Sequence, residues 1–287
     1  MYFTLIFAIH NRCLHPQSKE FIKTGMGINL VIAKLLLYCP NTRHKKVCLC
    51  MHVTEVTESF DLDNVVPFFQ PIMDLKNNAV WCYECLARLL TFDQSSYVPS
   101  EFLFLVGRQQ SVAQLTQNVF SRSACYFRDI NMAWNINLSL SDMTNANTLT
   151  FLQSQLEDYP NPKRISIEIT AQNALIERAK FSLFSEFCGA LGIKIVIDNF
   201  DQKGCDLQAI LALPISAIKV SATLFDKMAS DKATEKYVKE LIVAAASNKV
   251  VVIAERIERQ ETLEVVKQLG IKYAQGFYFS RPMAKTE

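Results

Sequence analysis

Histidine is absent from most of the chain, because all four histidines lie within residues 1–52. An enzyme built from residues 53–287 therefore cannot use imidazole as a general base or as a zinc ligand. The groups that remain for catalysis are carboxylates, lysine, tyrosine, cysteine and metal-bound water.

Glycine and proline are also sparse, with 8 and 9 residues in 287, and half of the chain is hydrophobic. This composition is typical of a globular protein. Residues 1–52 hold seven of the 30 Lys and Arg and one of the 28 acids, which leaves 23 and 27 for residues 53–287. The first segment is therefore +6 and the rest −4. The mildly acidic charge of residues 53–287 argues against a broad nucleic-acid-binding surface.

Long apolar runs are missing as well. The runs 2–9 and 27–39 are shorter than the 18–20 or so residues that cross a bilayer, so we predict no membrane span and a cytoplasmic protein. The nine cysteines lack regular spacing, which fits a reducing compartment, and Cys82 and Cys85 are interpreted as ordinary thiols. Residues 1–60 are expected to be a poorly ordered leader or linker; the alternative is that residues 1–50 are not part of the working protein and that translation starts at Met26 or Met51.

Short apolar strands alternate with helical stretches after residue 65. Strands are predicted at 66–75, 79–90, 133–138, 165–169, 193–198, 217–220, 250–257 and 272–275, and one long helix over 223–248. Roughly eight strands in about 220 residues predict an α/β fold, a TIM-barrel-like (β/α)8 domain over 61–287. The first two strands read as a hairpin, so one strand is expected to be antiparallel.

Polar residues stand at the ends of these strands, where a barrel of this type places its chemistry. Each one alone reads more simply as a helix cap or a turn residue. Gathered at one mouth, the acids would repel one another without a cation, and oxygen ligands favour Mg²⁺, Mn²⁺ or Ca²⁺ over zinc. The residues are Glu84, Asn137, Glu168, Asp198, Lys219, Glu255, Glu258 and Gln275.

Seven short motifs resemble those of the EAL family in order and spacing, from about Val65 to Met283. They are "QPIMDL…ECLAR", "NINLS", "IEIT", "IDNF", "IKV", "AERIE" and "QGFYFSRP". That family comprises TIM-barrel-like phosphodiesterases that open cyclic di-GMP to the linear dinucleotide pGpG. The resemblance implies the same ligand, a Mg or Mn cofactor, with Ca supporting binding only or inhibiting, and a homodimer or a protein partner.

The resemblance also implies roles for individual residues. Glu84, Asn137, Glu168 and Asp198 match the ligands of a first metal ion. Lys219, Glu255, Glu258 and Gln275 match catalytic positions, and Gln70, Pro71, Arg88 and Asn199 match positions that contact the nucleotide.

Two departures from the family pattern remove acids of a second metal site, and two others concern a neighbouring loop and the dimer. The family has a second aspartate where this chain has Asn199, an aspartate at Ser221, a glutamate at Ala171 and a different loop at 201–204. The five acids and Lys219 give a formal charge of −4 instead of −6, which suits one divalent cation. We therefore expect cyclic di-GMP binding with weak or absent hydrolysis; the alternatives are an active phosphodiesterase and a nucleotide-independent interaction module.

Overall fold

The computed structural model of the protein describes residues 60–93, 95–109, 111–201 and 206–285. The expectations about residues 1–59, including the alternative start sites, lie outside the described residues, and so does most of the altered loop at 201–204. No helix in the described part of the chain is long and apolar enough to cross a membrane.

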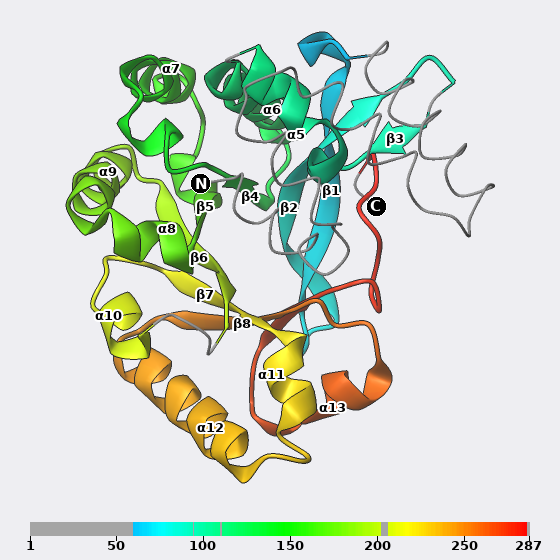
Figure 1. Cartoon of the computed structure of the whole chain (residues 1–287), viewed down its shortest axis with the longest axis vertical. Helices are drawn as coiled ribbons and strands as arrows, with labels where there is room; N and C mark the ends of the chain where they lie inside the picture. Colours follow the sequence, from blue (N-terminus) through cyan, green and yellow to red (C-terminus); the bar gives the residue numbers. More distant parts are fainter. Residues whose placement is uncertain (1–59, 94, 110, 202–205, 286–287) are drawn as a thin grey trace, which may run out of the picture. The chain divides into compact units, whose positions relative to one another are not determined.

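Eight strands close into a barrel (Figure 1). Their order is β1-β9-β8-β7-β6-β5-β4-β2, and a pairing of β1 with β2 completes the ring. β1 is antiparallel to both of its neighbours, whereas the other strands are parallel to one another. The predicted TIM-barrel-like fold with one antiparallel strand is confirmed. The strands are β1 (Val65–Asp74), β2 (Ala79–Leu90), β4 (Ala133–Asn137), β5 (Ile165–Thr170), β6 (Lys194–Phe200), β7 (Ala217–Ser221), β8 (Val251–Glu255) and β9 (Tyr273–Gln275).

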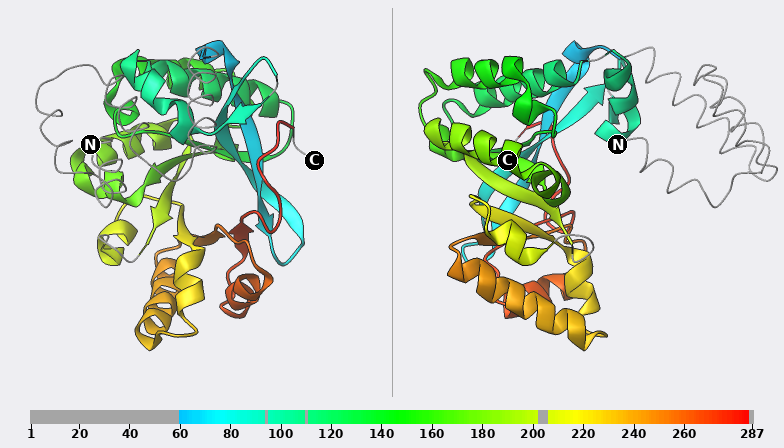
Figure 2. Two further views of the ribbon diagram at one scale, coloured as in Figure 1. Left: turned by 45° about the vertical axis from the view of Figure 1, so that its right-hand side comes forward. Right: turned by 60° about the vertical axis from the view of Figure 1, so that its left-hand side comes forward.

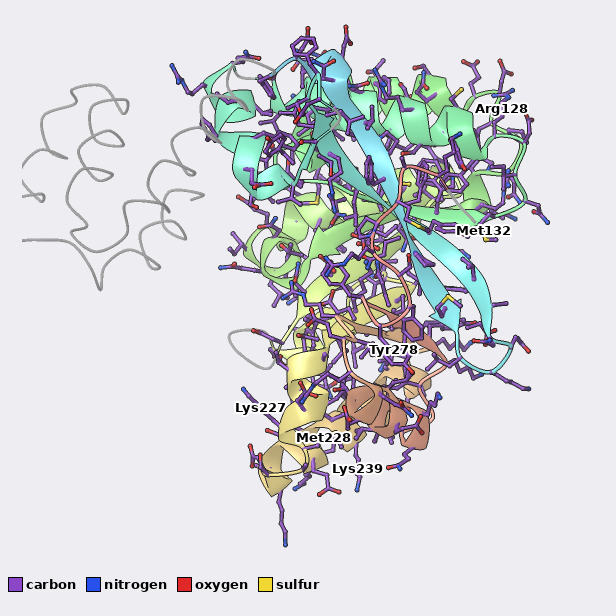
Figure 3. The ribbon with its side chains drawn as sticks, turned by 90° about the vertical axis from the view of Figure 1, so that its right-hand side faces the viewer. Arg128, Met132, Lys227, Met228, Lys239 and Tyr278 are labelled. Atoms are coloured by element: carbon purple, nitrogen blue, oxygen red, sulfur yellow. The ribbon has the colours of Figure 1, made fainter. Side chains whose placement is uncertain are left out.

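Helices cover the outside of this barrel (Figure 2). They are α5 (Pro99–Arg108), α6 (Val112–Phe127), α7 (Ala146–Leu156), α8 (Ala171–Ile176), α9 (Arg178–Ala190), α10 (Leu207–Leu211), α11 (Ala222–Lys227), α12 (Lys232–Ser247) and α13 (Gln260–Gln268), with 3₁₀ turns η2 (Leu62–Asn64), η3 (Asp142–Thr144) and η4 (Pro162–Arg164). Figure 3 shows Lys227 and Met228, at the end of α11, far from Arg128 and Met132 near the end of α6.

Two details of the predicted elements are wrong. The single helix expected over 223–248 is divided into α11 and α12, because Asp231 caps a new helix by accepting a hydrogen bond from the Ala233 N–H at 2.9 Å. A two-residue strand, β3 (Ser96–Tyr97), pairs with the end of β2 and was not predicted. It is too short to leave an alternating pattern in the sequence.

The barrel interior changes from apolar to polar over one step of two residues. Side chains two apart on a strand point to the same face. On each of five strands, a side chain of the apolar layer and a polar side chain two positions away therefore both point into the barrel. The pairs are Ile72 with Gln70, Cys82 with Glu84, Val196 with Asp198, Ala217 with Lys219 and Ile253 with Glu255.

Candidate functional site

Lys219 lies inside the polar end of the barrel with only 1% of its side chain exposed. Its Nζ donates to a Glu84 carboxylate oxygen at 2.8 Å and to Glu168 at 2.7 Å, and lies 4.0 Å from Asp198. These residues come from β7, β2, β5 and β6, so four predicted site residues far apart in sequence meet at one point.

Amide side chains complete the hydrogen bonding of Glu84. Asn137 Nδ2 donates to its Oε1 at 2.8 Å, and Gln275 Nε2 donates to its Oε2 at 2.7 Å. Gln275 also donates to Gln70 Oε1 at 3.1 Å. We call Lys219, Glu84, Glu168, Asn137 and Gln275 the lysine cluster.

The lysine cluster controls the charge of its members. Burial would raise the pKa of Glu84, but Lys219 and the amide donors hold it at about 2. Burial would lower the pKa of Lys219, but Glu168 and Glu84 raise it well above its ordinary value. Burial, with Glu84 nearby, raises the pKa of Glu168. Lys219 is therefore a buried cation in this arrangement.

Asn135 belongs to this layer, and the sequence reasoning missed it. Its Nδ2 donates to Glu168 Oε1 at 2.8 Å, and its Oδ1 accepts from the Cys82 thiol at 3.1 Å. The signal was present in "AWNINL", where Asn135 and Asn137 share a strand face. Burial raises the pKa of Cys82, in agreement with an ordinary thiol.

A second group lies at the ends of β6 and β8. Asn199 Nδ2 donates to Asp198 Oδ2 at 2.7 Å, and Asn199 Oδ1 accepts from Arg256 Nη2. Arg256 Nε lies 4.0 Å from Glu255 Oε1. We call Asp198, Asn199, Glu255 and Arg256 the arginine cluster. Arg256 was not predicted as a site residue, although it directly follows the strand that ends in Glu255.

Glu255 is buried, and its Oε1 has no hydrogen-bond partner among the described residues. Burial, with the Asp198 carboxylate close by, raises its pKa to about 7. Such a carboxyl group is poised to bind a proton or a cation near neutral pH.

Glu258 and Arg88 form no hydrogen bond with either cluster among the described residues. Glu258 is exposed in the loop after β8. Arg88 lies four residues beyond Glu84 on β2, donates to the Ala87 carbonyl at 2.7 Å and stands 6.0 Å from the Phe68 ring centroid.

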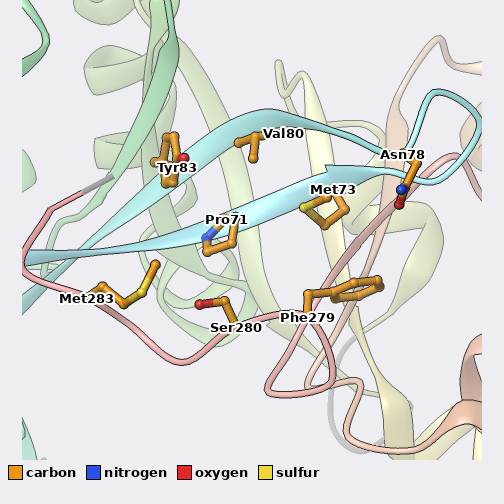
Figure 4. Close-up of a pocket in the computed structure, with 8 residues that line it drawn as sticks. All are labelled: Pro71, Met73, Asn78, Val80, Tyr83, Phe279, Ser280 and Met283. Carbon is orange, nitrogen blue, oxygen red and sulfur yellow. The ribbon is translucent and has the colours of Figure 1, made fainter. Parts of the chain in front are cut away.

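Pro71 faces away from Gln70, since neighbours on a strand point to opposite faces. It lines a cavity of about 250 Å³ between the β1–β2 hairpin and the C-terminal segment (Figure 4). The other lining residues are Met73, Asn78, Val80, Tyr83, Phe279, Ser280 and Met283.

Two positions that depart from the family pattern have structural roles. Ser221 is buried and caps α11, its Oγ accepting from the Thr223 N–H at 3.4 Å and from the Thr223 hydroxyl at 3.1 Å. Ala171 is the buried first residue of α8.

The oxygen donors of Glu84, Asn137, Glu168 and Asp198 are of the kind that hard divalent cations prefer. The unpartnered buried oxygen of Glu255 also fits a cation nearby. Within the described residues, no three His, Cys, Asp or Glu side chains already stand together as a metal-holding group. Lys219 binds two of the carboxylates instead, so the residues suit a divalent cation in kind but would have to turn from Lys219 to hold it.

The sequence model of the EAL domain matches residues 53–282. This chain belongs to the EAL domain family. The predicted resemblance is thereby confirmed, and it covers the whole barrel.

Relatives of this EAL domain include the probable cyclic di-GMP phosphodiesterase PdeB of Escherichia coli, 25% identical over 283 residues. The alignment covers 95% of this chain and 52% of PdeB, so the chain spans about half the length of that relative. A second relative is the signaling protein YkoW of Bacillus subtilis, which is 24% identical over 236 residues. That alignment covers 79% of this chain and 29% of YkoW.

Solved structures support the fold. The EAL domain of FimX from Pseudomonas aeruginosa, bound to c-di-GMP, is similar with a TM-score of 0.73 and 18% identity, covering 82% of this chain and 98% of that one. The YkuI protein of Bacillus subtilis, in complex with c-di-GMP and calcium, is similar with a TM-score of 0.71 and 20% identity, covering 82% of this chain and 59% of that one.

Proposed function

We propose that this EAL domain binds cyclic di-GMP together with one divalent cation, Mg or Mn, and hydrolyses it slowly or not at all. Family membership supports the ligand, as do a relative named as a probable cyclic di-GMP phosphodiesterase and two similar structures solved with c-di-GMP. The calcium in one of those structures supports a divalent cation. Calcium is expected to permit binding without turnover.

The observation that carries the proposal is the amide at position 199. Asn199 lies between Asp198 and Arg256, and it offers a metal no negative charge. Glu84, Asn137, Glu168 and Asp198 would hold the first cation, which when bound supplies charge screening for a phosphate and an acidified water. With an acid missing at 199 and at 221, we expect a hydrolysis rate about 10² to 10⁴ lower than that of an intact site.

The remaining residues keep their predicted roles in this proposal. Lys219, Glu255, Glu258 and Gln275 are proposed to act in catalysis; Lys219 and Gln275 also hydrogen-bond Glu84, and Glu255 would accept a proton near the reacting phosphate. Glu258, Gln70, Pro71, Arg88 and Asn199 are proposed to contact the nucleotide or its water, and the exposed positions of Glu258 and Asn199 leave them accessible to ligand.

An active phosphodiesterase is the second candidate. It is favoured by the convergence of Glu84, Lys219 and Gln275 in one hydrogen-bonded set, with Glu255 at the end of the adjoining strand β8. The two candidates differ only in turnover, because both bind the nucleotide.

Calorimetric titration of cyclic di-GMP in Mg²⁺, Mn²⁺ or Ca²⁺, followed by chromatography of the products, tests both candidates. Binding without product supports the proposal, and rapid conversion to the linear product supports the second candidate. Absence of binding with every cation contradicts both and leaves the interaction module. Asn199→Asp combined with Ser221→Asp should raise any residual rate, whereas Asn248→Asp with Ser247→Asp, the same change at the exposed end of α12, should not.

The wider organisation is also proposed here. We propose that the EAL domain occupies 61–287, that residues 1–60 are a leader or linker, and that the protein is cytoplasmic. A homodimer or a protein partner is expected from the family. Sedimentation of the purified chain, with and without ligand, measures the oligomeric state.

A further inference from the structure

Two residues at the barrel rim have a backbone conformation that side chains disfavour. Asn199 has φ 53° and Arg256 has φ 60°. Asparagine tolerates this left-handed region, but for an arginine it costs free energy that other contacts must offset. The side chains of these two residues are joined, because Asn199 accepts from the Arg256 guanidinium.

The amide of Asn199 makes a connection that a carboxylate cannot make. It donates to Asp198 and accepts from Arg256 at the same time. An aspartate at this position could accept from Arg256 but would repel Asp198, because an ionised carboxylate has no donor. Asn199 therefore links an acid to a fixed organic cation.

Charge and exposure distinguish Arg256 from Lys219. Four acids of the two clusters and these two cations sum to −2, the charge that one divalent cation neutralises; the acids are Glu84, Glu168, Asp198 and Glu255. The side chain of Arg256 is 62% exposed. Its guanidinium has five N–H donors in a planar fork that suits phosphate.

We propose that Arg256 takes the place of a second divalent cation: it screens Asp198 and Glu255 and offers its free donors to a phosphate of the bound dinucleotide. Glu255 Oε1, which has no hydrogen-bond partner among the described residues, is buried 4.0 Å from Arg256 Nε, so the guanidinium is the cation that faces it. The phosphate contact rests on the proposed function, whereas the replacement of a cation does not.

Counting bound Mn²⁺ per chain without nucleotide tests the replacement. We expect one ion in the wild type and two in Asn199→Asp/Arg256→Gly, where an acid is restored and the organic cation is removed. The control Asn199→Asp/Arg259→Gly should bind one, because Arg259 pairs with Asp226 at 2.7 Å outside both clusters. Two ions in the wild type, or one in the Arg256 double variant, would overturn the proposal.

Calorimetry with cyclic di-GMP in Mn²⁺ tests the phosphate contact. Arg256→Gln should weaken binding about tenfold or more, as expected for loss of a charge-assisted hydrogen bond, and Arg256→Lys should weaken it less. Arg259→Gln should bind like the wild type. Equal affinity of Arg256→Gln and the wild type would refute the contact. If the wild type fails to bind, the proposed function and with it the phosphate contact are rejected, and the Mn²⁺ count still decides whether Arg256 replaces a cation.

Discussion

Two cations stand at the same rim in opposite settings. Lys219 is 1% exposed and bonded to Glu84 and Glu168, whereas Arg256 is 62% exposed and is hydrogen-bonded to the amide of Asn199. A buried ammonium that satisfies buried acids is first a requirement of folding. An exposed guanidinium in a costly backbone conformation adds little to folding, which agrees with the proposed role of Arg256 in binding. Within one site, Lys219 therefore serves stability, and Arg256 is the residue proposed to serve recognition.

Removal of the buried cation should have the largest effect on stability. Lys219→Met should lower the free energy of unfolding by about 3–5 kcal/mol, because it leaves two buried carboxylates with amide donors but without a counter-charge. Urea denaturation in EDTA measures this loss, and added Mn²⁺ should restore part of it. Lys236→Met, at a 78% exposed side chain paired with Glu240, should change stability by less than about 0.5 kcal/mol. Equal stability of the two variants would contradict the structural role of Lys219.

The pH dependence of stability examines the arginine cluster. The pKa of Glu255 rises from 4.5 in the unfolded chain to about 7 when folded, so the folded state holds its proton more tightly. The resulting stabilisation is present below pH 4.5 and is lost as pH rises through 7, on the order of 3 kcal/mol. Melting of the metal-free protein between pH 5 and 8 should show this decline. Glu255→Gln should reduce the slope, and an unchanged slope would reject the assignment.

A substitution at Gly276 tests whether close backbone packing beside Arg256 contributes to stability. A Cβ at this residue would lie 2.0 Å from the Ile257 carbonyl oxygen, next to Arg256. Gly276→Ala should cost about 1–3 kcal/mol and disturb the hydrogen bonds of Ile257 with Gln275 and Tyr278. Thermal melting measures it. Gly189→Ala, in α9 with nothing within 4 Å, should be neutral or slightly stabilising, and a similar loss in both would contradict the argument.

The smallest effect is expected at Asn199 itself. Asn199→Gly keeps the left-handed backbone and removes the amide link, and should cost about 1 kcal/mol. Asn199→Ala should lower the free energy of unfolding by roughly 1 kcal/mol more, because the Cβ of alanine disfavours the positive φ at this position. Denaturation curves of both variants separate the two contributions, and a glycine variant less stable than the alanine variant would refute this partition.

Strand periodicity made the barrel and the lysine cluster predictable. Glu168 and Lys219 sit near the ends of parallel strands, which bring such ends together, and the register of β2 with β4 places Glu84, in the middle of β2, at the same level. Strand periodicity does not place Glu258, which lies three residues beyond the end of β8 in an exposed loop. Pro71 lies on the opposite strand face to Gln70, a consequence of alternation that motif matching does not consider.

Three members of the arginine cluster were predicted as site residues, but Arg256 and its contact with Asn199 could not be predicted from the sequence. Arg256 has a positive φ and is followed by Ile257, whose backbone lies against Gly276 in a tertiary contact. The bond from Arg256 to Asn199 spans 57 positions and follows no local pattern. Asn135 was within reach, because it shares a face with Asn137.

The seam of the barrel joins its first strand to its last. β1 pairs with β9, and Phe69 pairs further with Met283. During synthesis, β1 and β2 can form an early hairpin, but the free edge of β1 stays open until β9 has left the ribosome. An open edge is a template for pairing with other chains. The nascent domain is therefore exposed to aggregation for most of its translation, and it acquires Gln275, its last site residue, in the step that protects it.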